Sequence, residues 1–214
     1  MAKGLRDVDR VKLLLFNTQV HRSIDFSSDA QAVTRAMKDV PTGGATALFD
    51  TLGAALVAAR DPERRQLVMF FTDGLDSGSL TSDQVLKTMA ARARATVTFV
   101  TASLMPMPMQ FAPPSPIGST TQTVRAPIVR YTGPLVSSNS FLATVARDTG
   151  GEVVPVDATT SLGTVFRRIL DDFRSSYVLF YSPTGVDKTG FHTITVNVTR
   201  PDLVVTARRG YFGG

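Results

Sequence analysis

Thr46 and Asp73 are the two residues whose types and positions are suited to holding a cation. Asp73 directly follows the largely apolar run Gln66–Thr72, which predicts a buried strand. Thr46 follows Gly43 and Gly44 in a loop that leads into a helical pattern. In sheets covered by helices, ligands lie beyond the carboxyl ends of the strands. A hydroxyl and a carboxylate are hard oxygen ligands of the kind that Mg²⁺ accepts, with Mn²⁺ or Ca²⁺ as alternatives.

The same residues also have an ordinary structural interpretation. Threonine often caps the start of a helix, and aspartate often accepts backbone N–H groups in a turn. Gly74 lets the chain turn away after Asp73, and Asp76 is a second acid of the Ser/Gly-rich loop rather than a ligand. The sequence spacing of Thr46 and Asp73 alone favours this structural interpretation over a cation site. The predicted elements around the two residues show whether the two side chains can meet.

Hydrophobic periodicity predicts alternating strands and helices. The predicted strands are Val11–Phe16, Val20–Phe26, Gln66–Thr72, Thr96–Thr101, Glu152–Val156 and Tyr177–Tyr181, the second being an antiparallel edge strand. The predicted helices start at the capping boxes Ser28/Gln31 and Thr81/Gln84, or carry apolar stripes over 48–59, 141–145 and 162–173. This order favours an α/β fold in which helices flank a mostly parallel sheet.

The length is sufficient for one well-buried domain, residues 1–214. Two segments depart from the α/β pattern. Residues 103–140 are rich in Pro, Met, Ser and Thr without a lasting period, which predicts a long surface loop. Residues 190–208 alternate between apolar and polar types around a Pro-containing turn, which predicts a C-terminal antiparallel hairpin.

Composition excludes several classes of protein. The chain has no cysteine, and therefore no disulfide, thiolate metal site or cysteine nucleophile. No apolar run reaches the length of a membrane span, and the first residues lack the apolar core of a signal peptide. The net charge of +5 comes mostly from scattered basic pairs, so we expect no nucleic-acid partner.

The sequence lacks the residues that known catalytic motifs require. His21 lies in the predicted edge hairpin and His192 shares a face with Ile194, so neither has the setting of a catalytic base. The chain has no Gly-x-Ser-x-Gly elbow and no P-loop, and Phe71 stands where a haloacid-dehalogenase phosphatase has its nucleophile. We therefore predict no enzymatic activity. An α/β hydrolase-like or phosphatase-like enzyme with unrecognised catalytic residues is the alternative.

Three segments resemble the von Willebrand factor A superfamily, above all its bacterial, acidobacterial-type VWFA-related domains. They are GATALFD (44–50), FTDG (71–74) and the ending SSYVLFYSPTGVDKTGFHTITVNVTRPDLVVTARRGYF. The resemblance covers nearly the whole chain outside 103–140. It implies a Rossmann-like doubly wound sheet, an extracytoplasmic location, and adhesion-type binding of a protein partner. In this family a divalent cation, usually Mg²⁺, bridges a metal-ion-dependent adhesion site to an acidic side chain of that partner.

The resemblance matches Thr46 and Asp73 to two ligands of the family's metal site. The first ligand motif of the family, Asp-x-Ser-x-Ser after the central strand, occurs nowhere in this sequence. Val11–Phe16 matches the second strand of the family, so the central strand is expected to be missing. We interpret the chain as a fragment, with a degenerate domain as the alternative. The metal site would be partial, and would bind Mg²⁺ weakly or not at all.

The missing strand has a consequence for the sheet. It would lie between Val11–Phe16 and Gln66–Thr72, which must then pair directly, leave a gap or recruit another chain. Unpaired edges favour association, so we expect poor solubility or self-association. The predicted function is a non-enzymatic interaction domain with a partial metal site. A scaffold that binds without metal, through the Pro/Met-rich loop, is a further alternative.

Overall fold

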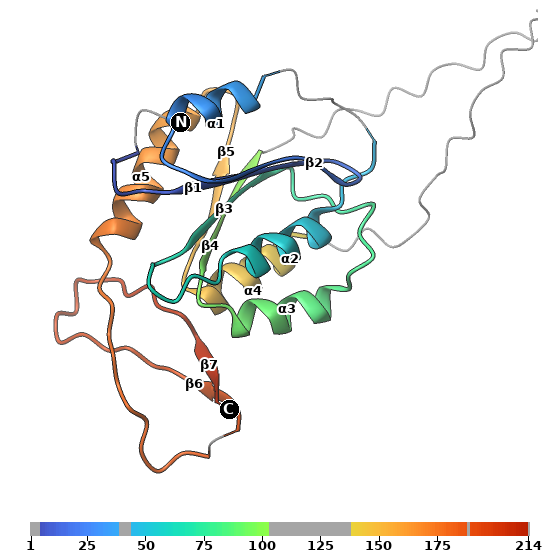
Figure 1. Cartoon of the computed structure of the whole chain (residues 1–214). Coiled ribbons are helices and arrows are strands. Elements are labelled where there is room, and N and C mark those ends of the chain that lie inside the picture. Colours follow the sequence, from blue (N-terminus) through green and yellow to red (C-terminus); the bar gives the residue numbers. More distant parts are fainter. Residues whose placement is uncertain (1–4, 39–43, 103–137, 188, 214) are drawn as a thin grey trace, which may run out of the picture.

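The computed structural model describes residues 5–38, 44–102, 138–187 and 189–213 (Figure 1). The strands are β1 (Val11–Phe16), β2 (Val20–Ser27), β3 (Leu67–Thr72), β4 (Thr96–Ala102), β5 (Val153–Val156), β6 (Gly190–Thr193) and β7 (Gly210–Gly213). The helices are α1 (Ala30–Ala36), α2 (Leu48–Ala58), α3 (Asp83–Arg92), α4 (Ser138–Thr149) and α5 (Leu162–Ser175). In this part of the chain no helix is long and apolar enough to cross a membrane.

The central sheet is parallel and has the strand order β3-β4-β5. β3 and β4 pair along the whole of β3, in register from Leu67↔Thr96 to Thr72↔Thr101. β5 pairs with the second half of β4. Because β4 is paired on both edges and covered on both faces, its residues 97–100 are buried. The nearly continuous apolar run of this strand is typical of such a position.

Helices cover both faces of this sheet, as Figure 1 shows. On one face α2, α3 and α4 contribute Leu52, Leu86 and Leu142, all fully buried, to a core that also contains Phe99 of β4. On the other face α5 places Ile169 in a smaller core with residues of β4 and β5. The two cores together bury the apolar stripes of the helices and the apolar residues of the strands. The predicted α/β fold, a doubly wound parallel sheet flanked by helices, is therefore confirmed.

β1 and β2 form a second, antiparallel sheet, which confirms the predicted edge hairpin. Figure 1 shows this hairpin lying across the direction of β3 to β5. Among the described residues no backbone ladder joins β1 to β3. Of the three outcomes expected for the missing strand, the observed one is a gap in the pairing between the two sheets.

Hydrogen bonds nevertheless tie the hairpin to the rest of the chain at both ends of β1. At the amino end, the guanidinium of Arg64, just before β3, donates to the carbonyl oxygen of Val8 (3.1 Å). At the carboxyl end, the N–H of Ala47, just before α2, donates to the carbonyl oxygen of Asn17 (2.7 Å). The position of the hairpin is therefore fixed although the strand pairing is interrupted.

Two helices start one residue later than their capping boxes predicted. The N-cap of α1 is Asp29, whose carboxylate accepts two N–H groups of the first turn, and not Ser28. The N-cap of α3 is Ser82, whose hydroxyl accepts the N–H of Val85, and not Thr81. Both helices begin in runs of neighbouring polar residues, so the capping-box spacing alone did not distinguish the true cap from its neighbour.

The C-terminal segment departs further from the prediction. Tyr177–Tyr181, predicted as a strand, belongs to no strand, and Phe180 is 93% exposed. The predicted 190–208 hairpin instead pairs Gly190–Thr193 with Gly210–Gly213, and residues 203–207 are in no strand. Gly210 explains this register, since a Cβ there would lie 2.3 Å from the carbonyl oxygen of His192. Most of the predicted 103–140 loop lies outside the described residues, and residues 138–140 begin α4.

Gly151→Ala is expected to destabilise the fold by about 1–3 kcal/mol, because a Cβ there would lie 2.0 Å from the carbonyl oxygen of Val97. Gly163→Ala in the first turn of α5 is the control, since a Cβ there meets no atom closer than 3.9 Å. Urea unfolding followed by circular dichroism compares the two variants. If Gly151→Ala were as stable as Gly163→Ala, the close packing of the α4–β5 turn against β4 would be wrong.

Candidate functional site

The loops that carry Thr46 and Asp73 are bonded to each other at the carboxyl end of β3. The carbonyl oxygen of Thr46 accepts the N–H groups of Ser77 (3.0 Å) and Gly78 (3.1 Å). The N–H of Thr46 donates to the hydroxyl oxygen of Ser77 (3.0 Å). The structure thus brings the two predicted site loops together, as the sequence indicated. We call residues 44–47 and 73–79 the carboxyl-edge loops.

Glycines permit the close approach of these loops. A Cβ at Gly78 would lie 3.1 Å from the Cβ of Ala45. Gly44 has a φ of +93°, and a Cβ there would also lie 2.8 Å from the hydroxyl oxygen of Thr18, so both backbone conformation and space favour glycine. Gly74 has a φ of +82°, which confirms it as the residue on which the chain turns after Asp73. Gly43 lies outside the described residues.

The start of α2 is capped from the loop that follows β3. The N-cap residue, Ala47, has no side chain that can accept a hydrogen bond. The hydroxyl oxygen of Ser79 accepts the N–H groups of Phe49 (2.9 Å) and Asp50 (3.2 Å) instead. Asp76 accepts the N–H of Phe49 (3.2 Å) and the hydroxyl of Ser79 (2.6 Å). Two residues that are distant in sequence thereby satisfy the first turn of α2.

Asp50 adds a second bridge from α2 to the same loop. Its carboxylate accepts the N–H groups of Leu80 (2.9 Å) and Thr81 (2.8 Å). Burial raises the pKa of Asp50, but hydrogen bonds from Thr81 and Leu80 outweigh it and lower the pKa below its usual value. A lowered carboxyl pKa means that this bridge stabilises the fold above the unfolded-state pKa of about 4 and loses that effect as the pH falls through the folded-state value.

Asp73 and Thr46 occupy different settings within the carboxyl-edge loops. Asp73 is exposed, and its carboxylate accepts the N–H of Leu75 (3.0 Å), which is the turn role that the sequence allowed. Thr46 is half-buried and is not the N-cap of α2, so its predicted alternative role as a cap is wrong. Asp76 is a structural acid of the loop, as expected, and its role in capping α2 is an addition.

Thr46 and Asp73 by themselves do not fit a Mg²⁺ site. Across the described residues, no group of three or more His, Cys, Asp or Glu side chains is placed to hold a metal ion. Mg²⁺ requires a nearly octahedral shell of oxygen ligands. One hydroxyl and one exposed carboxylate, an oxygen of which is already bonded to Leu75, supply a minor part of such a shell.

Comparisons with known proteins bear on the fold. A scan against protein-family models and a search of curated proteins found no match. The solved structure of BatB from Bacteroides thetaiotaomicron superposes with a TM-score of 0.55 at 15% identity, covering 82% of this chain and 83% of that one. An aerotolerance-related membrane protein from Bacteroides fragilis superposes with a TM-score of 0.52 at 12% identity, covering 82% and 83%. The SpRpn10 VWA domain superposes with a TM-score of 0.44 at 13% identity, covering 79% of this chain and 76% of that one.

The two Bacteroides structures share the fold of this chain at identities too low to carry over any chemistry. The α/β fold expected from the sequence, a parallel sheet flanked by helices, is thereby confirmed.

Ser79→Ala is expected to destabilise the fold by about 1 kcal/mol, because it removes the acceptor for two N–H groups of α2. Ser175→Ala is the control, since that exposed hydroxyl bonds only within α5. The measurement is the thermal midpoint by circular dichroism. Because Ser79 and Asp76 share a hydrogen bond, adding Asp76→Ala should cost less in the Ser79→Ala background than in the parent. Additive losses would show that the two residues act separately.

Proposed function

We propose that this chain is a non-enzymatic protein-interaction domain that binds an extended, apolar segment of a partner protein between β1 and β3. The observation that carries the proposal is the interrupted pairing between the two sheets. In the described chain, β1 pairs only with β2, and β3 pairs only with β4. Each strand therefore offers one row of backbone N–H and C=O groups to another strand.

The two open edges correspond at their ends, although β1 crosses the direction of β3 (Figure 1). Arg64, just before β3, reaches Val8, just before β1. At the other end, the carbonyl oxygen of Asn17, just after β1, accepts the N–H of Ala47. Ala47 belongs to the carboxyl-edge loops, which also include the residues that follow β3. The rings of Phe16 and Phe70 lie 5.1 Å apart and connect the two strands across the interruption. A segment entering here would start beside the amino ends of both strands and leave beside their carboxyl ends.

Burial along the strands supports an unfilled strand position. All six residues of β1 are only half-buried, and Phe70 is the one buried residue of β3. β4, which is paired on both edges, has four consecutive buried residues. The difference is what is expected if β1 and β3 each lack a neighbour that β4 has.

The same surroundings specify the chemistry of the partner segment. β1 and β3 are each six residues long, so they can pair with about six residues of an added strand. One face of β3 packs toward the large core below α2, and the other packs toward the smaller core beside α5. A strand between two such layers is apolar on both faces, as in other parallel sheets. We therefore expect Val, Ile, Leu or Phe at most of its positions.

The carboxyl end of the added segment would leave the sheet beside the carboxyl-edge loops. Thr46 and the exposed Asp73 would then face the residues that follow the segment, which gives these loops a role in selecting the partner. The resemblance to bacterial VWFA-related domains supports adhesion-type binding and an extracytoplasmic location. The partial metal site is proposed to be inactive in the chain alone, since its ligand set is too small.

Hydrogen-exchange mass spectrometry tests the open strand position. We expect amides of β1 and β3 to exchange faster than those of β4, which serves as the internal reference. A peptide with the β3 sequence Leu-Val-Met-Phe-Phe-Thr, flanked by lysines, is the probe, because it is apolar on both faces as the proposal requires. The probe should slow exchange in β1 and β3 together. The same peptide with alternate backbone nitrogens methylated keeps the side chains but should give no protection.

Equal protection of β1, β3 and β4 in the chain alone would contradict the proposal, because no strand position would then be open. So would a probe that protects only the free edge of β5. If protection of β1 and β3 instead rises with protein concentration, while sedimentation shows dimers, a second copy of the chain is filling the position.

The metal response forms a separate test. Calorimetric titration with MgCl₂ or MnCl₂ is expected to show no saturable binding to the chain alone, because Thr46 and Asp73 do not complete a ligand shell. Asp73→Ala is the matched variant, and Asp61→Ala, another exposed acid that bonds a backbone N–H two residues on, is the control. Saturable heat that disappears in Asp73→Ala but not in Asp61→Ala would show that the site binds metal by itself.

A further inference from the structure

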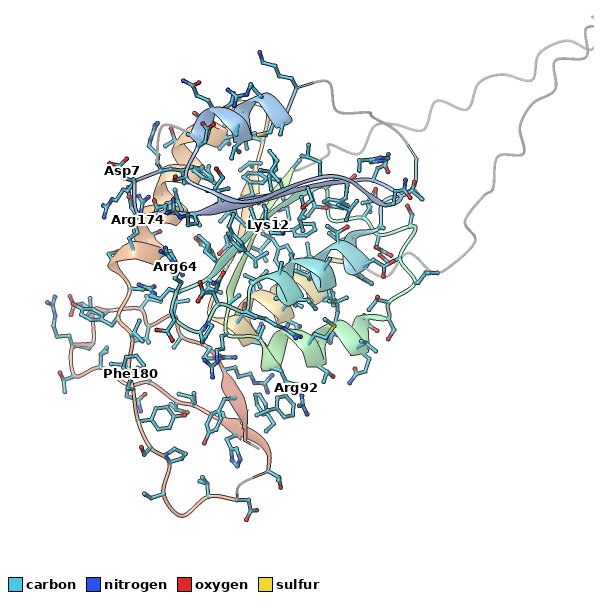
Figure 2. The ribbon with its side chains drawn as sticks, viewed as in Figure 1. Asp7, Lys12, Arg64, Arg92, Arg174 and Phe180 are labelled. Carbon is cyan, nitrogen blue, oxygen red and sulfur yellow. The ribbon has the colours of Figure 1, made fainter. Side chains whose placement is uncertain are left out.

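A second feature lies at the opposite end of the sheet from the carboxyl-edge loops. There, the end of α3 and strand β7 border a half-open pocket of about 360 Å³. It is next to the start of β4, because Arg94 precedes that strand by two residues. Figure 2 labels Arg92 in this region, at the end of α3 beside β7. The pocket is lined by Ala91, Arg92, Arg94, Arg208, Tyr211, Phe212 and Gly213.

Three arginines line this pocket and no acidic residue does. None of the salt bridges between described residues involves Arg92, Arg94 or Arg208. The neighbouring Arg209 differs, since its guanidinium lies 3.9 Å from the carboxylate of Asp148. The pocket therefore concentrates positive charge that the described part of the chain leaves uncompensated.

Arg208 is held in place by the end of α3. Its Nη2 donates to the carbonyl oxygens of Ala91 (3.2 Å) and Ala93 (2.9 Å). Its Nε is buried and has no hydrogen-bond partner among the described residues. Burial lowers the pKa of Arg208, which means that its surroundings disfavour the charge. The partial negative charge of a helix end, about half an elementary charge, is too small to balance three guanidinium groups.

The other lining groups give the pocket an apolar side. The guanidinium of Arg92 lies over the ring of Phe212, 4.5 Å from its centre, which orients this otherwise exposed side chain. The ring of Phe212 in turn packs against Phe191 of β6 at 5.3 Å. Tyr211 and Ala91 complete the wall. Guanidinium groups together with ring and methyl surfaces suit a ligand with an anionic end and an apolar body.

We propose that this pocket binds a small ligand whose anionic group, a phosphate monoester or a carboxylate, is joined to an apolar or aromatic body. Its volume is within the range of small-molecule sites. Guanidinium groups match the paired oxygens of both anions and bind them through two parallel hydrogen bonds. The site does not depend on the strand position between β1 and β3, because no residue of either strand lines the pocket.

Calorimetric titration with phenyl phosphate and with benzoate, at matched ionic strength, tests the assignment. At least one of them is expected to bind saturably with one site per chain, and the tighter one identifies the anion. Arg94→Gln and Arg92→Gln should each weaken binding by about tenfold or more. Both side chains are exposed, so the variants should fold, and circular dichroism checks this. Arg167→Gln removes the same charge from an exposed position on α5 and should leave binding unchanged.

Failure of both ligands to bind the parent chain overturns the proposal. It is also overturned if Arg167→Gln weakens binding as much as Arg94→Gln, because the attraction would then be that of the net charge rather than of the pocket. Loss of strand binding in the hydrogen-exchange experiment would leave this result untouched.

Discussion

The parallel ladder between β3 and β4 is the interaction on which the rest of the chain depends. β4 pairs with β3 on one edge and with β5 on the other, and its buried residues contribute to the cores on both faces. The ladder also sets the two ends of the sheet. The chain leaves β3 at the carboxyl edge, passes through α3, and re-enters at the start of β4. The carboxyl-edge loops and the arginine-lined pocket are therefore the two ends of one crossover.

At the carboxyl edge, tertiary hydrogen bonds replace a local helix cap that the sequence does not provide. A helix that begins after Ala47 has no side chain to bond its first N–H groups. Ser79 and Asp76 provide those acceptors from the loop after β3. The start of α2 and the end of β3 are thus stabilised together, and neither loop can move without exposing buried N–H groups of the other.

The sequence predicts well what depends on local patterns. Apolar runs located β1, β3 and β4, and the glycine at position 74 marked the turn after Asp73. The interruption between β1 and β3 followed from a motif that the sequence lacks. Predictions failed where several residues compete for one role or where distant segments meet. In the polar runs before α1 and α3, the capping-box spacing predicted each N-cap one residue too early. The close contact at Gly210 determines the register of the C-terminal hairpin, which the alternation of apolar and polar residues did not reveal.

The energetics of adding a strand between β1 and β3 restrict its partner more than the geometry does. Ordering one residue of an extended segment costs about 1–2 kcal/mol, and each backbone hydrogen bond returns roughly 0.5–1.5 kcal/mol. Main-chain pairing alone therefore comes close to cancelling the cost of ordering the segment. The balance is decided by side chains, since burying one large apolar side chain contributes about 1.5–3 kcal/mol. The half-buried residues of β1 and β3 gain from the same burial. Selection of the partner thus begins with apolarity on both faces, and the polar carboxyl-edge loops can discriminate only among segments that already meet that requirement.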